Sequence, residues 1–177
     1  MGITRKIIVL EDKLEEIFSY LPRMKYIATS QLDHKVVFGS GDKKALNVFL
    51  KIKGKGDSPY PLIWLLYPYE ETHNRTNLSV DKVTLVLAVP TNQSMQNKQR
   101  LNETYKKVLF PLFDNLVYCL EHANIVNIAR EFKVVKYPNY SDEQSSSEES
   151  AGTFVWDALK VNFQITIRDT CLKPIIF

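Results

Sequence analysis

The chain has 177 residues, of which 45% are hydrophobic and 24% are charged, and its formal net charge is +3. These proportions exclude collagen-like and wholly disordered chains, and the length predicts a single globular domain over residues 1–177 with a core large enough to need no disulfide or metal. The two cysteines fit no zinc-ligand spacing, and no apolar run approaches the ~20 residues of a membrane span. We therefore expect an intracellular protein with no cofactor, no metal and no membrane contact.

The charge is distributed unevenly. Basic residues outnumber acidic ones over residues 1–140, and acidic residues outnumber basic ones over residues 141–177. A protein that reads a DNA sequence carries a stronger basic bias on one element, so we expect at most non-specific proximity to nucleic acid. The polar, acidic stretch 140–150 has nothing to bury and predicts a mobile loop inserted in the domain at about 139–153.

Two amphipathic helices are predicted in the first third of the chain. Apolar residues recur at helical spacing from Leu10 to Leu21, which predicts a helix over residues 11–20 that ends at Pro22. The segment 39–44 carries two glycines without the Walker spacing, so it predicts a turn leading to the N-cap Asp42. The helix that follows is predicted over residues 43–52, before Gly54. Its apolar stripe is predicted to consist of Ala45, Val48, Phe49 and Ile52.

Strands and one long helix are predicted in the rest of the chain. The apolar run 62–67 predicts a strand covered on both faces, and the alternating run 80–89 predicts its partner across a long polar hairpin loop, residues 70–79. The strongest helix is predicted over residues 98–123, where Pro111 should kink or split it. Residues 125–128 and 132–137 predict a strand or an irregular edge. Apolar and polar residues alternate strictly over residues 158–167, which predicts a half-exposed antiparallel strand. Its row of polar side chains is expected to stay solvated or to pair with a neighbour. The fold class is therefore α+β: a mainly antiparallel β-sheet packed against one long and one or two short helices.

The side chains that could take part in catalysis form no strong catalytic pattern. Cys119 and His122 are three residues apart on the long helix, which would permit a thiolate–imidazolium pair, but leucines at 116 and 120 favour a small buried thiol. Walker, zinc-protease, nucleophile-elbow and dinucleotide motifs are absent from the sequence. We therefore expect a protein that is not an enzyme.

Two groups of residues are candidates for an interface. The aromatic residues Tyr67, Tyr69 and Trp156 lie beside polar loops, as interface aromatics do. The lysines at 43–55 fall mostly off the apolar stripe and face solvent or a partner. If these lysines lined a channel, they would contact nucleic-acid phosphates without recognising the base sequence.

Four segments resemble one family of proteins. They are 60–68 (YPLIWLLYP), 83–89, 100–116 (RLNETYKKVLFPLFDNL) and 156–165 (WDALKVNFQI). Together they resemble head–tail connector or tail-terminator proteins, the neck-ring components of tailed bacteriophages, including the crAss-like phages of Bacteroides hosts. The resemblance covers about residues 58–168.

The resemblance implies a tail-terminator-like fold and a structural role in the virion. It implies a homo-oligomeric ring of six or twelve copies in the neck or tail, joined to the portal and to adjacent neck and tail ring proteins around the double-stranded DNA channel, after assembly in the host cytoplasm. The ring-interface or channel candidates are Lys43, Lys44, Lys51, Tyr67, Tyr69, Trp156 and Arg168. The alternatives are a non-enzymatic cytoplasmic adaptor that binds a protein partner through its loops and, third, an enzyme based on Cys119 and His122.

Overall fold

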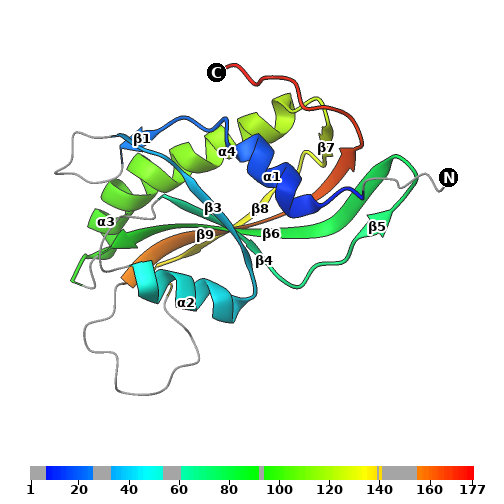
Figure 1. The fold of residues 1–177 in the computed structure, drawn as a ribbon. Coiled ribbons are helices and arrows are strands. Elements are labelled where there is room, and N and C mark those ends of the chain that lie inside the picture. Colours follow the sequence, from blue (N-terminus) through cyan, green and yellow to red (C-terminus); the bar gives the residue numbers. More distant parts are fainter. Residues whose placement is uncertain (1–6, 26–32, 54–60, 92–93, 139, 141–154) are drawn as a thin grey trace.

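The computed structural model describes residues 7–25, 33–53, 61–91, 94–138, 140 and 155–177. These residues form an α+β fold around a seven-stranded, mostly antiparallel sheet, which confirms the predicted fold class (Figure 1). The predicted acidic loop at 139–153 lies outside the described residues, apart from Tyr140.

The sheet has the order β3-β4-β6-β9-β7, with β5 paired to β6 and β8 paired to β9. Only β3 and β4 run parallel. A separate two-stranded sheet is formed by β1 and β2. The strand bounds are β1 Met24–Lys25, β2 Asp33–His34, β3 Val37–Gly41, β4 Leu62–Leu66, β5 Thr72–His73, β6 Asn77–Thr91, β7 Val126–Ile128, β8 Lys133–Tyr137 and β9 Val155–Arg168.

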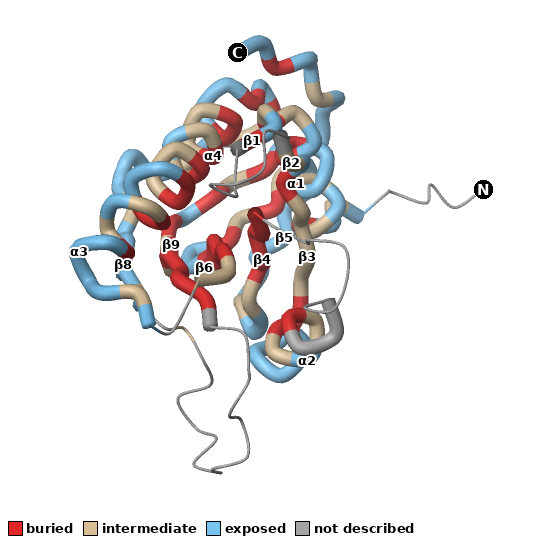
Figure 2. The backbone as a smooth tube through the Cα atoms, turned by 90° about the vertical axis from the view of Figure 1, so that its left-hand side faces the viewer, coloured by how far each residue is buried: buried red, intermediate tan, exposed pale blue. Residues whose placement is uncertain are grey.

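The helices lie on both faces of the sheet (Figure 1). One face is covered by α1 (Leu10–Phe18) and by a long continuous helix made of α3 (Asn97–Arg100), the π-helix η1 (Leu101–Leu109) and α4 (Phe110–His122). The opposite face is covered in part by α2 (Lys43–Lys53). Figure 2 shows buried backbone concentrated along β4, β6 and β9, the strands between these layers.

Strand alternation builds the larger core. Val161, Phe163 and Ile165 of β9 point toward α1 and the long helix and are buried, whereas Gln164 and Arg168 are exposed on the other face. This is the half-exposed strand that the alternating sequence predicts. In β6, a register shift between Val80 and Val83 keeps apolar side chains on the core face across the irregularity.

The smaller core under α2 differs from the sequence prediction. The helix buries Leu46 and Leu50, and Phe49 packs against the ring of Trp64 with centroids 5.3 Å apart. Val48, which we predicted in the apolar stripe, is 47% exposed. Ala45, also in the predicted stripe, is exposed, whereas Phe49 is partly buried as that stripe requires. Burial of the two leucines beside the ring of Trp64 removes their apolar surface from water and favours the observed face. Asp42 caps the helix as predicted, since its carboxylate accepts the N–H of Ala45 at 2.7 Å. The predicted end at Gly54 lies outside the described residues.

Strand β3 replaces the turn predicted over residues 39–41. Gly39 and Gly41 lie under the indole of Trp64, and the indole N–H donates to the Gly41 carbonyl oxygen at 3.1 Å. Gly41 has φ +151°, a backbone conformation that favours glycine. The two glycines are therefore strand residues that leave room for a tryptophan 23 to 25 positions later.

Other differences concern element bounds and hydrogen-bonding pattern. The predicted hairpin loop at 70–79 contains β5 and the start of β6. Residues 126–128 and 133–137 form the regular strands β7 and β8, which both pair with β9. The long helix continues through Pro111, and its hydrogen-bonding pattern changes from π to α between Leu109 and Phe110, next to this proline.

Candidate functional site

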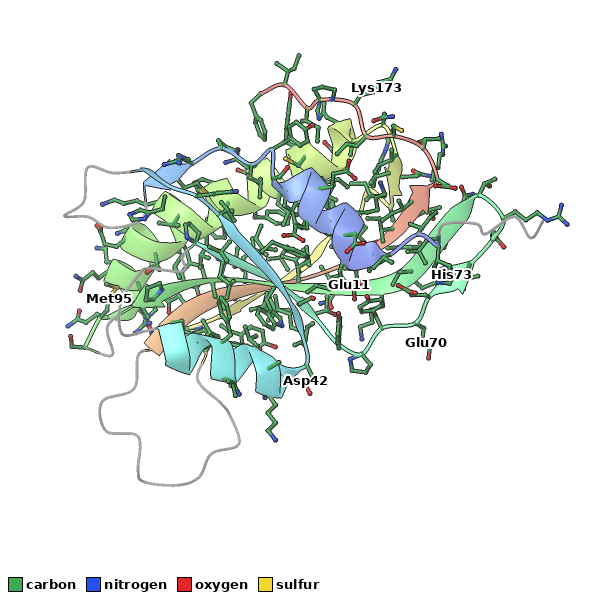
Figure 3. All side chains as sticks on the ribbon, viewed as in Figure 1. Glu11, Asp42, Glu70, His73, Met95 and Lys173 are labelled. Carbon is green, nitrogen blue, oxygen red and sulfur yellow. The ribbon has the colours of Figure 1, made fainter. Side chains whose placement is uncertain are left out.

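One end of the sheet carries a cluster of two tyrosines and a glutamate. Glu11 lies in the first turn of α1, where the positive end of the helix dipole favours a carboxylate. Tyr67 and Tyr69 follow directly after β4, on either side of Pro68. Figure 3 shows Glu11 on the same side of the fold as Glu70 and His73, with Met95 at the opposite end.

Both phenols donate to the same carboxylate oxygen. The hydroxyls of Tyr67 and Tyr69 each lie 2.5 Å from Oε1 of Glu11, and the Tyr67 hydroxyl also lies 3.3 Å from Oγ of Ser40 on β3. The two rings meet edge to face, with centroids 5.4 Å apart and planes at 68°. The hydrogen bonds thus hold two aromatic rings edge to face beside one carboxylate.

The protonation states fit this arrangement. Burial raises the pKa of the Glu11 carboxyl, but the hydrogen bonds from Tyr67 and Tyr69 outweigh it, so the pKa lies below its ordinary value. Burial and the bond to Glu11 raise the pKa of both phenols. At neutral pH the carboxylate is therefore ionised and both hydroxyls keep the protons that they donate.

The cluster forms the wall of a pocket of about 590 Å³. Its lining combines Glu11, Tyr67, Tyr69 and Glu71 with apolar side chains of residues 7–9. The volume lies in the range of ligand pockets. A second cavity of about 300 Å³ shares residues 7 and 8 and lies beside His73, whose Nε2 is 2.9 Å from a Glu71 carboxylate oxygen.

Some predicted candidates lie at this end of the sheet. Lys43 and Lys44 are exposed at the start of α2, which follows Gly41, and the Gly41 carbonyl oxygen accepts the N–H of Tyr67 at 3.0 Å; neither lysine lines the pocket. The side chain of Lys51 lies outside the described residues.

The remaining two candidates lie apart from the pocket. Trp156 pairs with Pro90 near one end of β9 and is buried in the core under α2, so it packs rather than faces a partner. Arg168 is exposed at the other end of the same strand, opposite Asn77. The structure therefore joins the two predicted tyrosines but separates Trp156 and Arg168.

Cys119 and His122 do not form the reactive pair that their spacing would allow. Cys119 is fully buried in the larger core, and burial raises the pKa of its thiol to about 11. The imidazole of His122 is exposed, stacks on the ring of Tyr118 at 3.8 Å and lies 2.9 Å from the Tyr118 carbonyl oxygen through Nδ1. The thiol is thus held as a neutral core group.

The sheet ends in two different edges. The Val37 N–H donates to the Pro61 carbonyl oxygen, and Gly41 accepts from Tyr67, so both residues direct their backbone groups at β4. Because backbone groups alternate in direction along a strand, the N–H and C=O groups of Phe38 and Ser40 point away from β4. Among the described residues, no strand pairs with that side of β3. The opposite edge is formed by β7 and β8, which pair only with β9 in the described part of the chain, and Val135 of β8 is 44% exposed.

The described residues contain no group of three or more His, Cys, Asp or Glu side chains placed to hold a metal ion. Within the same residues, no helix combines the length and apolar character needed to cross a bilayer. A scan against protein-family models gives no match, and a sequence search of curated proteins gives none either.

Sequence reasoning missed Glu11 as a member of the site. In the sequence it is one of several acidic residues on an amphipathic helix, and it lies 56 and 58 positions from its two tyrosine partners. The run Tyr-Pro-Tyr after a buried strand is the only local signal, and it marks two of the three residues.

Proposed function

We propose that this protein is a structural ring subunit of a tailed-bacteriophage neck or tail. In this role, copies of the chain close into a ring that joins the portal to the tail, contacts the adjacent ring proteins and surrounds the DNA channel of the virion. The proposal combines the resemblance of four core segments to neck-ring proteins with one structural observation, the pair of open sheet edges.

The two edges favour association of identical copies. An unpaired strand edge presents backbone N–H and C=O groups that pair readily with another strand. Here the edges are unlike, β3 with its glycines on one side and β8 with Val134 and Val135 on the other. Contact between β3 of one copy and β8 of the next is therefore heterologous, and such contacts close into a ring when the rotation per copy divides a full turn.

The test is to measure the mass and shape of the purified chain and of two variants at Ser40. Light scattering should give a multiple of the 20.5 kDa chain mass, and negative-stain electron microscopy should show closed rings with a central hole. Ser40→Pro removes a backbone N–H that points away from β4, so the fold should persist while the rings are lost. Ser40→Ala is the matched control, because it removes the hydroxyl and keeps the N–H, and it should still form rings.

Two results contradict the proposal. A monomer at every concentration tested would refute self-assembly and favour the adaptor alternative. Rings of normal symmetry from folded Ser40→Pro protein would show that β3 is not the contact edge. Circular dichroism of each variant establishes that the fold is present.

A further inference from the structure

The described lining of the pocket beside Glu11 carries negative charge. It contains the carboxylates of Glu11 and Glu71 and no lysine or arginine. Glu71 has the imidazole of His73 within 2.9 Å, whereas the described partners of the Glu11 carboxylate are two neutral phenols and a backbone N–H. A pocket of this composition attracts a cation.

The carboxylate of Glu11 can accept further hydrogen bonds from a bound cation. Both tyrosine hydroxyls donate to Oε1, and no side chain of another described residue donates to Oε2. An ionised carboxylate accepts about four hydrogen bonds, so a donor from outside the chain can still approach Oε2. Because the phenols already fix the carboxylate in place, little side-chain freedom is lost on binding.

The aromatic and apolar surroundings narrow the kind of cation. Tyr67 is 37% exposed and its hydroxyl bonds to Glu11, so partly exposed aromatic surface lies next to the carboxylate. Beyond it, Ile7 is 71% exposed and Val9 is 41% exposed. A planar guanidinium stacks on an aromatic face while it donates to a carboxylate, and the methylenes of an arginine lie along apolar surface.

We propose that this pocket receives an arginine side chain presented by a partner protein, with the guanidinium bound to Glu11 and stacked on Tyr67. The exposed side chains of Ile7 and Val9 contact the stem of that arginine. The inference does not depend on ring assembly.

The test compares an arginine derivative with its uncharged citrulline counterpart and with a lysine derivative. Saturation-transfer NMR on the full-length protein, which works for a monomer and a ring alike, is recorded with N-acetyl-arginine amide and with N-acetyl-citrulline amide. The arginine derivative should bind saturably in the millimolar range expected of one side chain, and the citrulline derivative should bind at least about tenfold more weakly. N-acetyl-lysine amide should bind more weakly than the arginine derivative.

Variants then locate the site. Glu11→Gln should weaken arginine binding about tenfold or more, whereas Glu16→Gln, on an exposed glutamate of the same helix, should leave it unchanged. Tyr67→Leu, which keeps Glu11 and removes the exposed ring, should weaken it about two- to fivefold. Equal binding of citrulline or lysine, or unchanged binding by both the Glu11 and the Tyr67 variants, would overturn the proposal.

Discussion

The buried ion pair between Arg100 and Asp157 provides the strongest test of the fold. The Nη1 atom of Arg100 lies 2.5 Å from Oδ1 of Asp157, and the two side chains are 3% and 0% exposed. Arg100 ends α3 and Asp157 lies near the start of β9, so the pair joins the long helix to the sheet. The guanidinium also donates to the Met95 carbonyl oxygen at 3.2 Å. Each charge is thus buried and partly compensated by the other.

Removing one partner should be far more costly than removing both. Asp157→Leu leaves a buried guanidinium without this carboxylate, and Arg100→Met leaves a fully buried carboxylate without the guanidinium. Each should lower the free energy of unfolding by about 3–5 kcal/mol. The double variant has no buried charge at these positions, so we expect it to lie within about 2 kcal/mol of wild type.

Urea unfolding followed by circular dichroism and tryptophan fluorescence measures these differences. An exposed ion pair provides the control: Lys107 and Glu103 are also 2.5 Å apart, but their side chains are 61% and 39% exposed. Glu103→Gln should therefore cost at most about 0.5 kcal/mol. A single-variant cost below about 1 kcal/mol at Asp157, or a double variant as unstable as the sum of the two single variants, would refute the reasoning.

Three further predictions concern packing, thiol reactivity and pH. Gly39→Ala should destabilise the fold by about 1–3 kcal/mol in the same urea assay, because the new Cβ would lie 2.7 Å from a ring carbon of Trp64; unchanged stability would show that the ring does not sit over this strand. In the native protein, a thiol reagent followed by peptide mass spectrometry should label exposed Cys171 rapidly and buried Cys119 only after unfolding; equal rates would contradict the burial of Cys119. Because the folded pKa of Glu11 lies below its ordinary 4.5, its ionised form stabilises the fold above that pH and the contribution is lost as the pH falls through the folded pKa. Glu11→Gln should therefore be less stable than wild type at pH 7, and urea titrations should show the difference shrinking below pH 4.5, whereas a difference independent of pH would argue against the hydrogen-bonded carboxylate.

The elements that the sequence predicts well are those with a strong local pattern. The strict alternation over residues 158–167 identifies β9 and its buried face, and the long apolar face over residues 98–123 identifies the long helix. Asp42 is identified as a cap because capping involves neighbours three residues apart. In each case the deciding contacts lie within one helix or one strand.

The elements that it predicts poorly depend on distant residues. Strand β3 has two glycines and a weak apolar pattern, and it is recognisable only once Trp64 is placed over it. The buried face of α2 depends on the same ring, which favours Leu46 and Leu50 over the predicted stripe. Local periodicity leaves several faces nearly equal in these segments, and long-range packing selects one of them.

The sequence by itself determined the α+β class, the half-exposed last strand and two tyrosines of the candidate pocket. Only the tertiary structure joined Glu11 to those tyrosines, buried Trp156 in the small core and left β3 on one side and β7 with β8 on the other as the outer edges of the sheet. The physical reason is the range of the interactions. Helix and strand periodicity acts between residues a few positions apart, whereas a shared carboxylate or a sheet edge depends on which distant segments pair.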